Sequence, residues 1–100
     1  MATLYISEYA EVRRNPAGGI NPVVLEPPLA EQTVALSGTS AQSSAFGANT
    51  RFIRVHTDAI CSILVGSNPT ATTAKKRLPA DHTEYFEVTP GDKIAGITNT

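Results

Sequence analysis

The sequence holds few side chains that could do chemistry together, and the tightest group of them lies in residues 56–61. His56 and Asp58 are separated by one threonine, Cys61 follows closely, and His82 is the second histidine of the chain. A zinc site needs three or four ligands that converge on one point. An H-x-D-x-x-C run at a tight bend directs these groups apart, so we expect no bound metal and no cofactor.

The stretch EYFEVTPGDKIAGI, residues 84–97, concentrates charged groups around a Pro-Gly pair. Glu84 and Glu87 fall on opposite faces of a strand because their spacing is odd, so they cannot act together on one glycosidic bond. Asp92 follows the Pro-Gly pair, where an aspartate commonly supports the hydrogen bonds of a turn. Ser62 lacks the flanking glycines of a G-x-S-x-G nucleophile motif. The sequence therefore predicts two strands and a bend here, no catalytic residue, and a protein that is not an enzyme.

Composition limits the partners and the cellular setting. The 100 residues suffice for one domain, and the net charge of −1 gives no general attraction to nucleic acid or to an anionic membrane. The only basic run, residues 75–77, is typical of a solvated loop or strand edge. Cys61 is the only cysteine and lies in an apolar run, which favours a small buried side chain. Without a long apolar stretch or a signal-peptide pattern, we expect synthesis in the cytoplasm.

Short alternating segments predict the elements that position these residues. The expected strands cover residues 3–9, 23–25, 31–37, 42–46, 50–56, 59–65, 75–79, 83–88 and 93–98. The two-residue break after His56 has the length of a β-hairpin turn, and residues 93–98 form the return strand after Pro90-Gly91, a type II turn pair. No helix is expected. The predicted fold is a small antiparallel β-sandwich or jelly roll, with an extended Pro-rich N-terminal arm.

Strand faces indicate a candidate core. In the expected strands that end at His56 and Val65, alternate apolar residues share one face, and the strand before the Pro-Gly turn has a similar face. The expected core residues are Ile53, Val55, Ile63, Val65, Phe86, Val88 and Ile94.

The N-terminal third has a different composition. Residues 11–32 contain four prolines and two glycines, so no regular helix can run through them. We therefore divide the single domain into residues 1–30, a first strand with an extended arm, and residues 31–100, the β-sandwich.

This arm predicts an interface with a neighbouring subunit. Leu4, Tyr5 and Ile6 could add a strand to an exposed sheet edge, a mode in which main-chain hydrogen bonds supply affinity. Arg13 and Arg14 could then pair with carboxylates of the partner. The alternative is that the first strand folds back into its own sandwich.

Residues 50–97 contain a series of short motifs. They are C-x-x-x-x-G-x-x-P-T-A-T from Cys61 to Thr72, L-P-A at 78–80, E-Y-F-x-V at 84–88 and P-G-D-K-I-A at 90–95. This series resembles the second half of small tailed-bacteriophage virion proteins. The opening MATLYISEYAEV is similar to the start of such proteins. The matching residues are those of strands and turns rather than reactive groups.

The resemblance implies a capsid decoration, or cement, protein that binds the outer surface of the major capsid lattice and stabilises the head. It implies a β-rich fold, location on the virion, and no catalytic residues. Its partners are then the major capsid protein and further copies of itself, as a dimer or trimer, with no nucleic acid and no membrane.

Other functions stay open. One is a head–tail connector or tail component of the virion. Another is a β-sandwich that binds a carbohydrate or small molecule. A binding module of that kind should present exposed aromatics, whereas this chain has no tryptophan and six aromatic residues, most at positions expected in the core.

Overall fold

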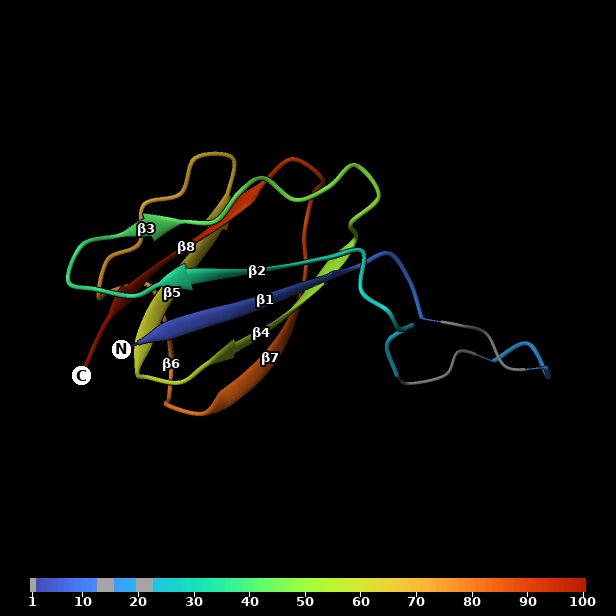
Figure 1. Cartoon of the computed structure of the whole chain (residues 1–100), viewed down its shortest axis with the longest axis horizontal. Coiled ribbons are helices and arrows are strands. Elements are labelled where there is room, and N and C mark those ends of the chain that lie inside the picture. The colour runs from blue at the N-terminus through green and yellow to red at the C-terminus, as the bar shows by residue number, and fades with distance from the viewer. Residues whose placement is uncertain (1, 13–15, 20–22) are drawn as a thin grey trace.

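The structure is a computed structural model that describes residues 2–12, 16–19 and 23–100. In these residues it contains strands and no helix, which confirms the predicted all-β fold (Figure 1). The strands are β1 (Thr3–Tyr9), β2 (Ala30–Ala35), β3 (Ala41–Gln42), β4 (Phe52–Thr57), β5 (Cys61–Gly66), β6 (Lys76–Leu78), β7 (His82–Glu87) and β8 (Lys93–Thr98).

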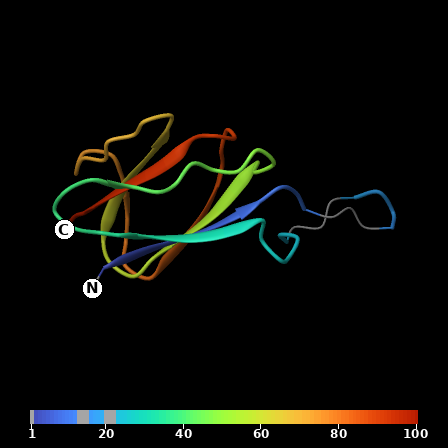
Figure 2. The ribbon, with the colours of Figure 1, turned by 45° about the horizontal axis from the view of Figure 1, so that its top comes forward.

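Two antiparallel four-stranded sheets form the two layers of a sandwich, as Figure 2 shows. The first sheet has the order β2-β1-β4-β7, and the second has the order β3-β8-β5-β6. We can renumber the strands so that β2 becomes strand 1, β3 to β8 become strands 2 to 7, and β1 becomes strand 8. The two sheets then have the orders 1-8-3-6 and 2-7-4-5. That is the strand order of a jelly roll, with the N-terminal strand in the place of the final one.

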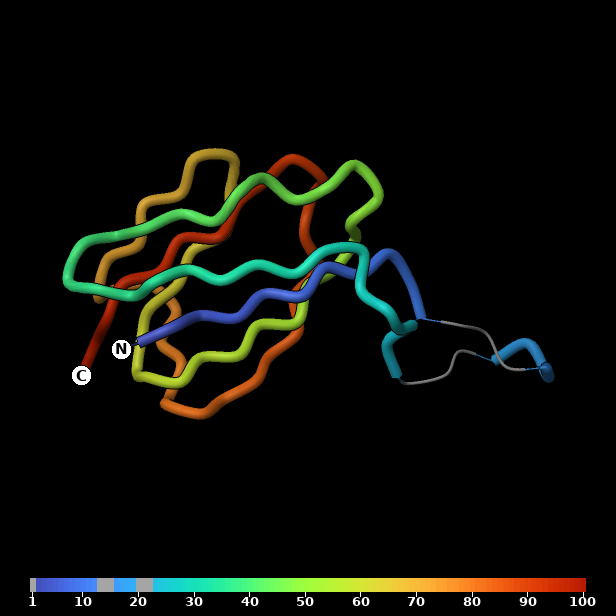
Figure 3. The backbone as a smooth tube through the Cα atoms, in the orientation of Figure 1, coloured from blue at the N-terminus to red at the C-terminus, as the bar shows by residue number. Residues whose placement is uncertain are grey.

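The first strand lies inside this sandwich, hydrogen-bonded on both sides. Leu4 lies opposite Val34 of β2 and Thr57 of β4, and the same register continues along the strand. Residues 3–9 therefore belong to the same folded unit as residues 31–100. The described parts of the β1–β2 connection, residues 10–12, 16–19 and 23–29, lie at and beyond one end of the sandwich (Figure 3).

The core lies between the sheets and is built from alternate residues of the facing strands. Of the expected core residues, Ile53, Val55, Ile63 and Ile94 are buried. The remaining three, Val65, Phe86 and Val88, are half-buried and pack against the cluster. Phe86 belongs to the edge strand β7, where the sandwich opens and the Lys76 Nζ atom lies 4.7 Å from the centre of its ring.

The predicted hairpin between β4 and β5 is wrong, because the two strands belong to different sheets. The Thr57 hydroxyl donates to the carbonyl of Ala59 and accepts from the Ala59 amide. The Thr57 side chain therefore holds the bend in place. A carboxylate oxygen of Asp58 accepts a hydrogen bond from the Thr3 amide at 2.7 Å. The chain thus leaves the first sheet at a bend that is anchored to β1, and enters the second.

The connection from β7 to β8 also crosses between the sheets, so β8 is not the hairpin partner of β7. Its turn is as expected. The Asp92 amide donates to the Thr89 carbonyl, and Gly91 has φ +88°, as the second of the two central residues of a type II turn requires. The opening stretch is therefore two strands and a bend. In two other places the sequence predicted too much strand, since residues 23–25 form none and β3 is short.

Residues 67–74, which include the P-T-A-T motif, lie over the outer face of the second sheet. The Gln42 side-chain amide donates to the Asn68 side chain and to the Pro69 carbonyl. The Ser62 hydroxyl on the sheet donates to the Thr73 carbonyl, and Ser62 is fully buried. The chain therefore covers this outer face with its own loop.

We expect Ile53→Ala to lower the free energy of unfolding by about 2–5 kcal/mol, because it removes a fully buried side chain and leaves a cavity. Urea denaturation followed by circular dichroism measures the change. Ile97→Ala is the matched control, since Ile97 is half-buried on an outer face and should lose much less. Equal losses in the two variants would contradict this assignment of the core.

Candidate interaction surface

The outer face of the first sheet carries a group of large side chains, most of them aromatic. Strand alternation directs them away from the core, which takes Leu4, Ile6, Ile53 and Val55 instead. We call this surface the aromatic face. Its residues are Tyr5, Tyr9, Phe52, Arg54, His56 and Tyr85.

Strand register arranges the aromatic face in rows across the sheet. One row reads Thr33, Tyr5, His56, Thr83, the next reads Glu31, Ser7, Arg54, Tyr85, and the third contains Tyr9, Phe52, Glu87. The rings of Tyr9 and Phe52 stack with centroids 5.5 Å apart, and those of Tyr5 and His56 are 6.2 Å apart. Tyr5 is 45% exposed and Tyr85 52% exposed, so two aromatic rings are available to a partner.

Arg54 occupies the middle of this face and has no partner among the residues that the structure describes. It is half-buried between Ser7 of β1 and Tyr85 of β7, and it forms no hydrogen bond or ion pair with any described residue. The nearby carboxylate of Glu31 instead accepts a hydrogen bond from Ser7 at 3.2 Å. Because a guanidinium carries five donors in a fixed fork, Arg54 keeps its full capacity for an acceptor from outside the chain.

At the end of the sandwich nearest the arm, the aromatic face has a ridge with a groove beside it. The Tyr9 hydroxyl donates to the Glu26 carboxylate at 2.9 Å, and Tyr9 is only 3% exposed. Burial, and then the contact with Glu26, raises the pKa of Tyr9. Beside this covered tyrosine runs an open groove, whose apolar lining is Ala10, Val12, Phe52, Tyr85, Phe86 and Val88. A ridge and a groove therefore lie next to each other at the arm end.

The interface residues predicted from the sequence are separated by the structure. Leu4 and Ile6 are buried in the core of their own chain, and β1 has no free edge, so the first strand folds back as the alternative required. Tyr5 alone of the three points outward, onto the aromatic face. Arg13 and Arg14 lie outside the described residues.

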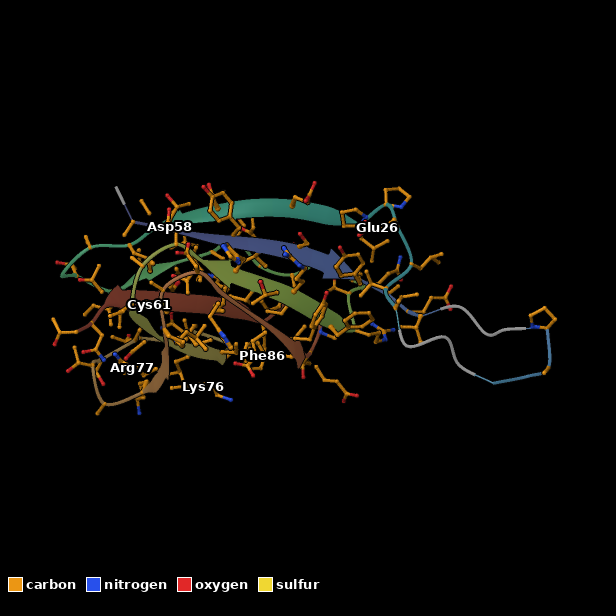
Figure 4. All side chains as sticks on the ribbon, turned by 90° about the horizontal axis from the view of Figure 1, so that it is seen from below. Glu26, Asp58, Cys61, Lys76, Arg77 and Phe86 are labelled. Atoms are coloured by element: carbon orange, nitrogen blue, oxygen red, sulfur yellow. The ribbon has the colours of Figure 1, made fainter. Side chains whose placement is uncertain are left out.

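The side chains that could have formed a reactive group do not converge. In the described residues there is no group of three or more His, Cys, Asp or Glu side chains placed to hold a metal ion. Asp58 and Cys61 lie at the end of the sandwich opposite Glu26 (Figure 4), and Asp58 is bound to Thr3. The other contacts are His56 to Thr83 at 2.8 Å, His82 to Glu84 at 3.0 Å, and Cys61 to Thr57 at 3.5 Å.

Glu8 is an important polar residue that the sequence analysis missed. The residue is 3% exposed, and its side chain lies on the inner face of β1. It accepts hydrogen bonds from the Gly47 amide at 2.9 Å, the Thr50 hydroxyl at 2.8 Å and the Gln32 side chain at 3.3 Å. Glu8 therefore fastens the loop before β4 to the first sheet. The sequence did contain a signal for this position. Glu8 continues the alternation of Leu4 and Ile6, so its side chain points to the same inner face.

The chain has no match among models of protein families, curated proteins or solved structures. No helix of the described residues is long and apolar enough to cross a membrane.

Burial raises the pKa of the Cys61 thiol, and the thiolate is the reactive form. We therefore expect Cys61 in the folded protein to react with a disulfide reagent at pH 8 far more slowly than after denaturation in urea. An exposed thiol introduced by Ala74→Cys in a Cys61→Ser background is the control and should react at once. Rapid labelling of Cys61 in the folded wild type would show that this strand face is accessible.

We expect Glu8→Ala to cost about 1–3 kcal/mol of stability, because it leaves the buried Thr50 hydroxyl and the partly buried Gly47 amide without this acceptor. Glu87→Ala, which removes an exposed carboxylate, is the matched control and should change the unfolding midpoint little. The measurement is urea denaturation at constant pH. A midpoint for Glu8→Ala equal to that of wild type would contradict the role of Glu8.

Proposed function

We propose that this protein is a non-enzymatic bacteriophage virion protein that decorates the capsid, binding the outer surface of the major capsid lattice and stabilising the head. The proposal starts from the resemblance of residues 50–97 to small virion proteins. Some of the residues that carry the resemblance serve the fold, since Gly91 forms a turn and residues 69–72 lie in the loop that covers the second sheet. Tyr85, within the E-Y-F-x-V motif, lies instead on the aromatic face.

The observation that best supports a docking role is the difference between the two outer faces. The second sheet is covered by its own loop, whereas the first presents two half-exposed tyrosines around an unpaired arginine. Tyrosine and arginine are the residues most enriched at the centres of protein–protein interfaces. An open face of this composition suits recognition of a surface better than conversion of a substrate.

The size of the protein is consistent with such a role. A chain of 100 residues builds only a modest core, so contacts with neighbours add stability that the monomer cannot reach alone. A capsid lattice presents many identical sites at high local concentration, which allows a small interface to reach high occupancy.

A second candidate is a carbohydrate-binding protein, and one observation favours it. Most of the six aromatic residues are buried or half-buried, as expected, but Tyr5 and Tyr85 are exposed on one face. Aromatic rings with an apolar body and a polar tip can pack on the apolar face of a sugar ring.

Binding to purified heads tests the proposal. Heads and tails are prepared separately from a phage in which the gene is deleted, each is mixed with the purified protein, and sedimentation separates bound from free. We expect the protein to sediment with heads in a fixed ratio to the capsid protein, and to raise the temperature at which the heads open.

The other candidates give different results in the same experiment. Sedimentation with tails alone would favour a connector or tail component. Binding to immobilised glycans, lost in Tyr85→Ala and accompanied by no binding to heads, would favour the carbohydrate-binding protein. Binding to neither particle would overturn a virion role.

A further inference from the structure

We propose that the aromatic face pairs with the same face of a second copy, about a two-fold axis that runs along the strands between β1 and β4. This inference concerns the chain itself. Two paired copies would occupy the aromatic face in each other, so a copy that uses this face on the capsid must first leave the pair. It follows from the order of side chains across the first sheet and from the groove at its arm end.

The row of side chains through Arg54 is complementary to the same row of a second copy when that row runs in the opposite direction. Across the sheet it reads Glu31, Ser7, Arg54, Tyr85. A two-fold axis along the strands places β4 of one copy over β1 of the other and β7 over β2, so the row meets itself in the opposite direction. Arg54 then lies over Ser7, and Tyr85 lies over Glu31.

This arrangement supplies the acceptor that Arg54 lacks among the described residues of its own chain. Glu31 is exposed, and its carboxylate is held beside Ser7 by the 3.2 Å hydrogen bond. The guanidinium of one copy therefore meets a carboxylate of the other, and symmetry forms the pair twice. Charge-assisted hydrogen bonds of this kind are short and directional, and burial between two sheets strengthens them.

The same axis matches the ridge of one copy with the groove of the other. It places the end of β1, where Glu26 covers Tyr9, over the start of β4 at Phe52. Phe52 and Val88 line the groove at that end of the sheet. The start of β2 comes to lie over the end of β7 beside the same groove. One symmetry operation thus brings an acceptor to Arg54 and the ridge of one copy to the groove of the other.

The charges of the face favour a second copy over a nucleic acid. One unpaired arginine stands among two exposed carboxylates, Glu31 and Glu87, and such a balance does not attract a phosphate backbone. It does attract a surface with the same groups in reverse order.

The area of the aromatic face determines how strong a dimer we expect. Four strands of about six residues cover roughly 400 Å² in projection, which is about half of the surface that one partner buries in a standard interface. We therefore expect a dimer that dissociates on dilution, at concentrations that sedimentation velocity can cover, rather than an obligate dimer.

Charge reversal and mixing test the pairing directly. We expect Arg54→Glu and Glu31→Arg each to remain monomeric at concentrations where wild type dimerises, because each creates two contacts of like charge. An equimolar mixture of the two variants should dimerise again, since both contacts then join opposite charges. Lys75→Glu, a charge reversal away from the aromatic face, is the control and should dimerise as wild type does. Sedimentation velocity gives the mass, and circular dichroism checks that every variant is folded.

Three results would overturn the proposal. The first is a wild type that stays monomeric at every concentration, which would leave the aromatic face to another partner, whether the capsid protein or a sugar. The second is Arg54→Glu dimerising as wild type does. The third is a mixture of folded Arg54→Glu and Glu31→Arg in which no dimer forms. Recovery of the dimer on mixing supports the pairing of these two positions and no other arrangement of the face.

Discussion

The two-sided pairing of β1 is the constraint on which the rest of the structure depends. β2 and β4 do not pair with each other, so the first sheet is continuous only because β1 joins them. Its inner side chains supply Leu4 and Ile6 to the core, and its Glu8 carboxylate holds the loop that leads into β4. Its outer side chains form part of the aromatic face. One seven-residue strand therefore links the core, the connections and the accessible surface.

The sequence predicted the elements well where a local pattern determines them. Strict alternation located β1, and Pro90-Gly91 located the turn before β8, because both signals depend on neighbouring residues alone. It failed where the outcome depends on distant residues. The break after Thr57 is short enough for a hairpin, but its Asp58 binds Thr3 of another strand and the chain passes to the other sheet. Nothing local to that bend distinguishes the two outcomes.

The candidate site was missed for a related reason. Tyr5, Phe52, Arg54 and Tyr85 come from three strands, and only their register brings them onto one face. The sequence analysis singled out Tyr5 as a member of an edge-pairing strand, whereas the structure uses the edges of that strand internally and leaves only its outer side chain free. Tyr5 lies in the similar opening and Tyr85 in the E-Y-F-x-V motif, but the resemblance to virion proteins could not locate the face, because a local motif does not give the strand register that brings these side chains together.

The position of the first strand bears on how the chain could be rearranged. β1 begins and β8 ends at the same end of the sandwich, away from the arm (Figure 1), where the Thr98 amide bonds to Ser37 and the Leu36 amide to Ala2. A circular permutant that joins these ends and opens the chain within the arm would make β1 the last strand. The sheets would then follow the jelly-roll order from the first residue to the last, with every pairing kept. Continuity between β1 and β2 is thus a property of the gene rather than a requirement of the fold.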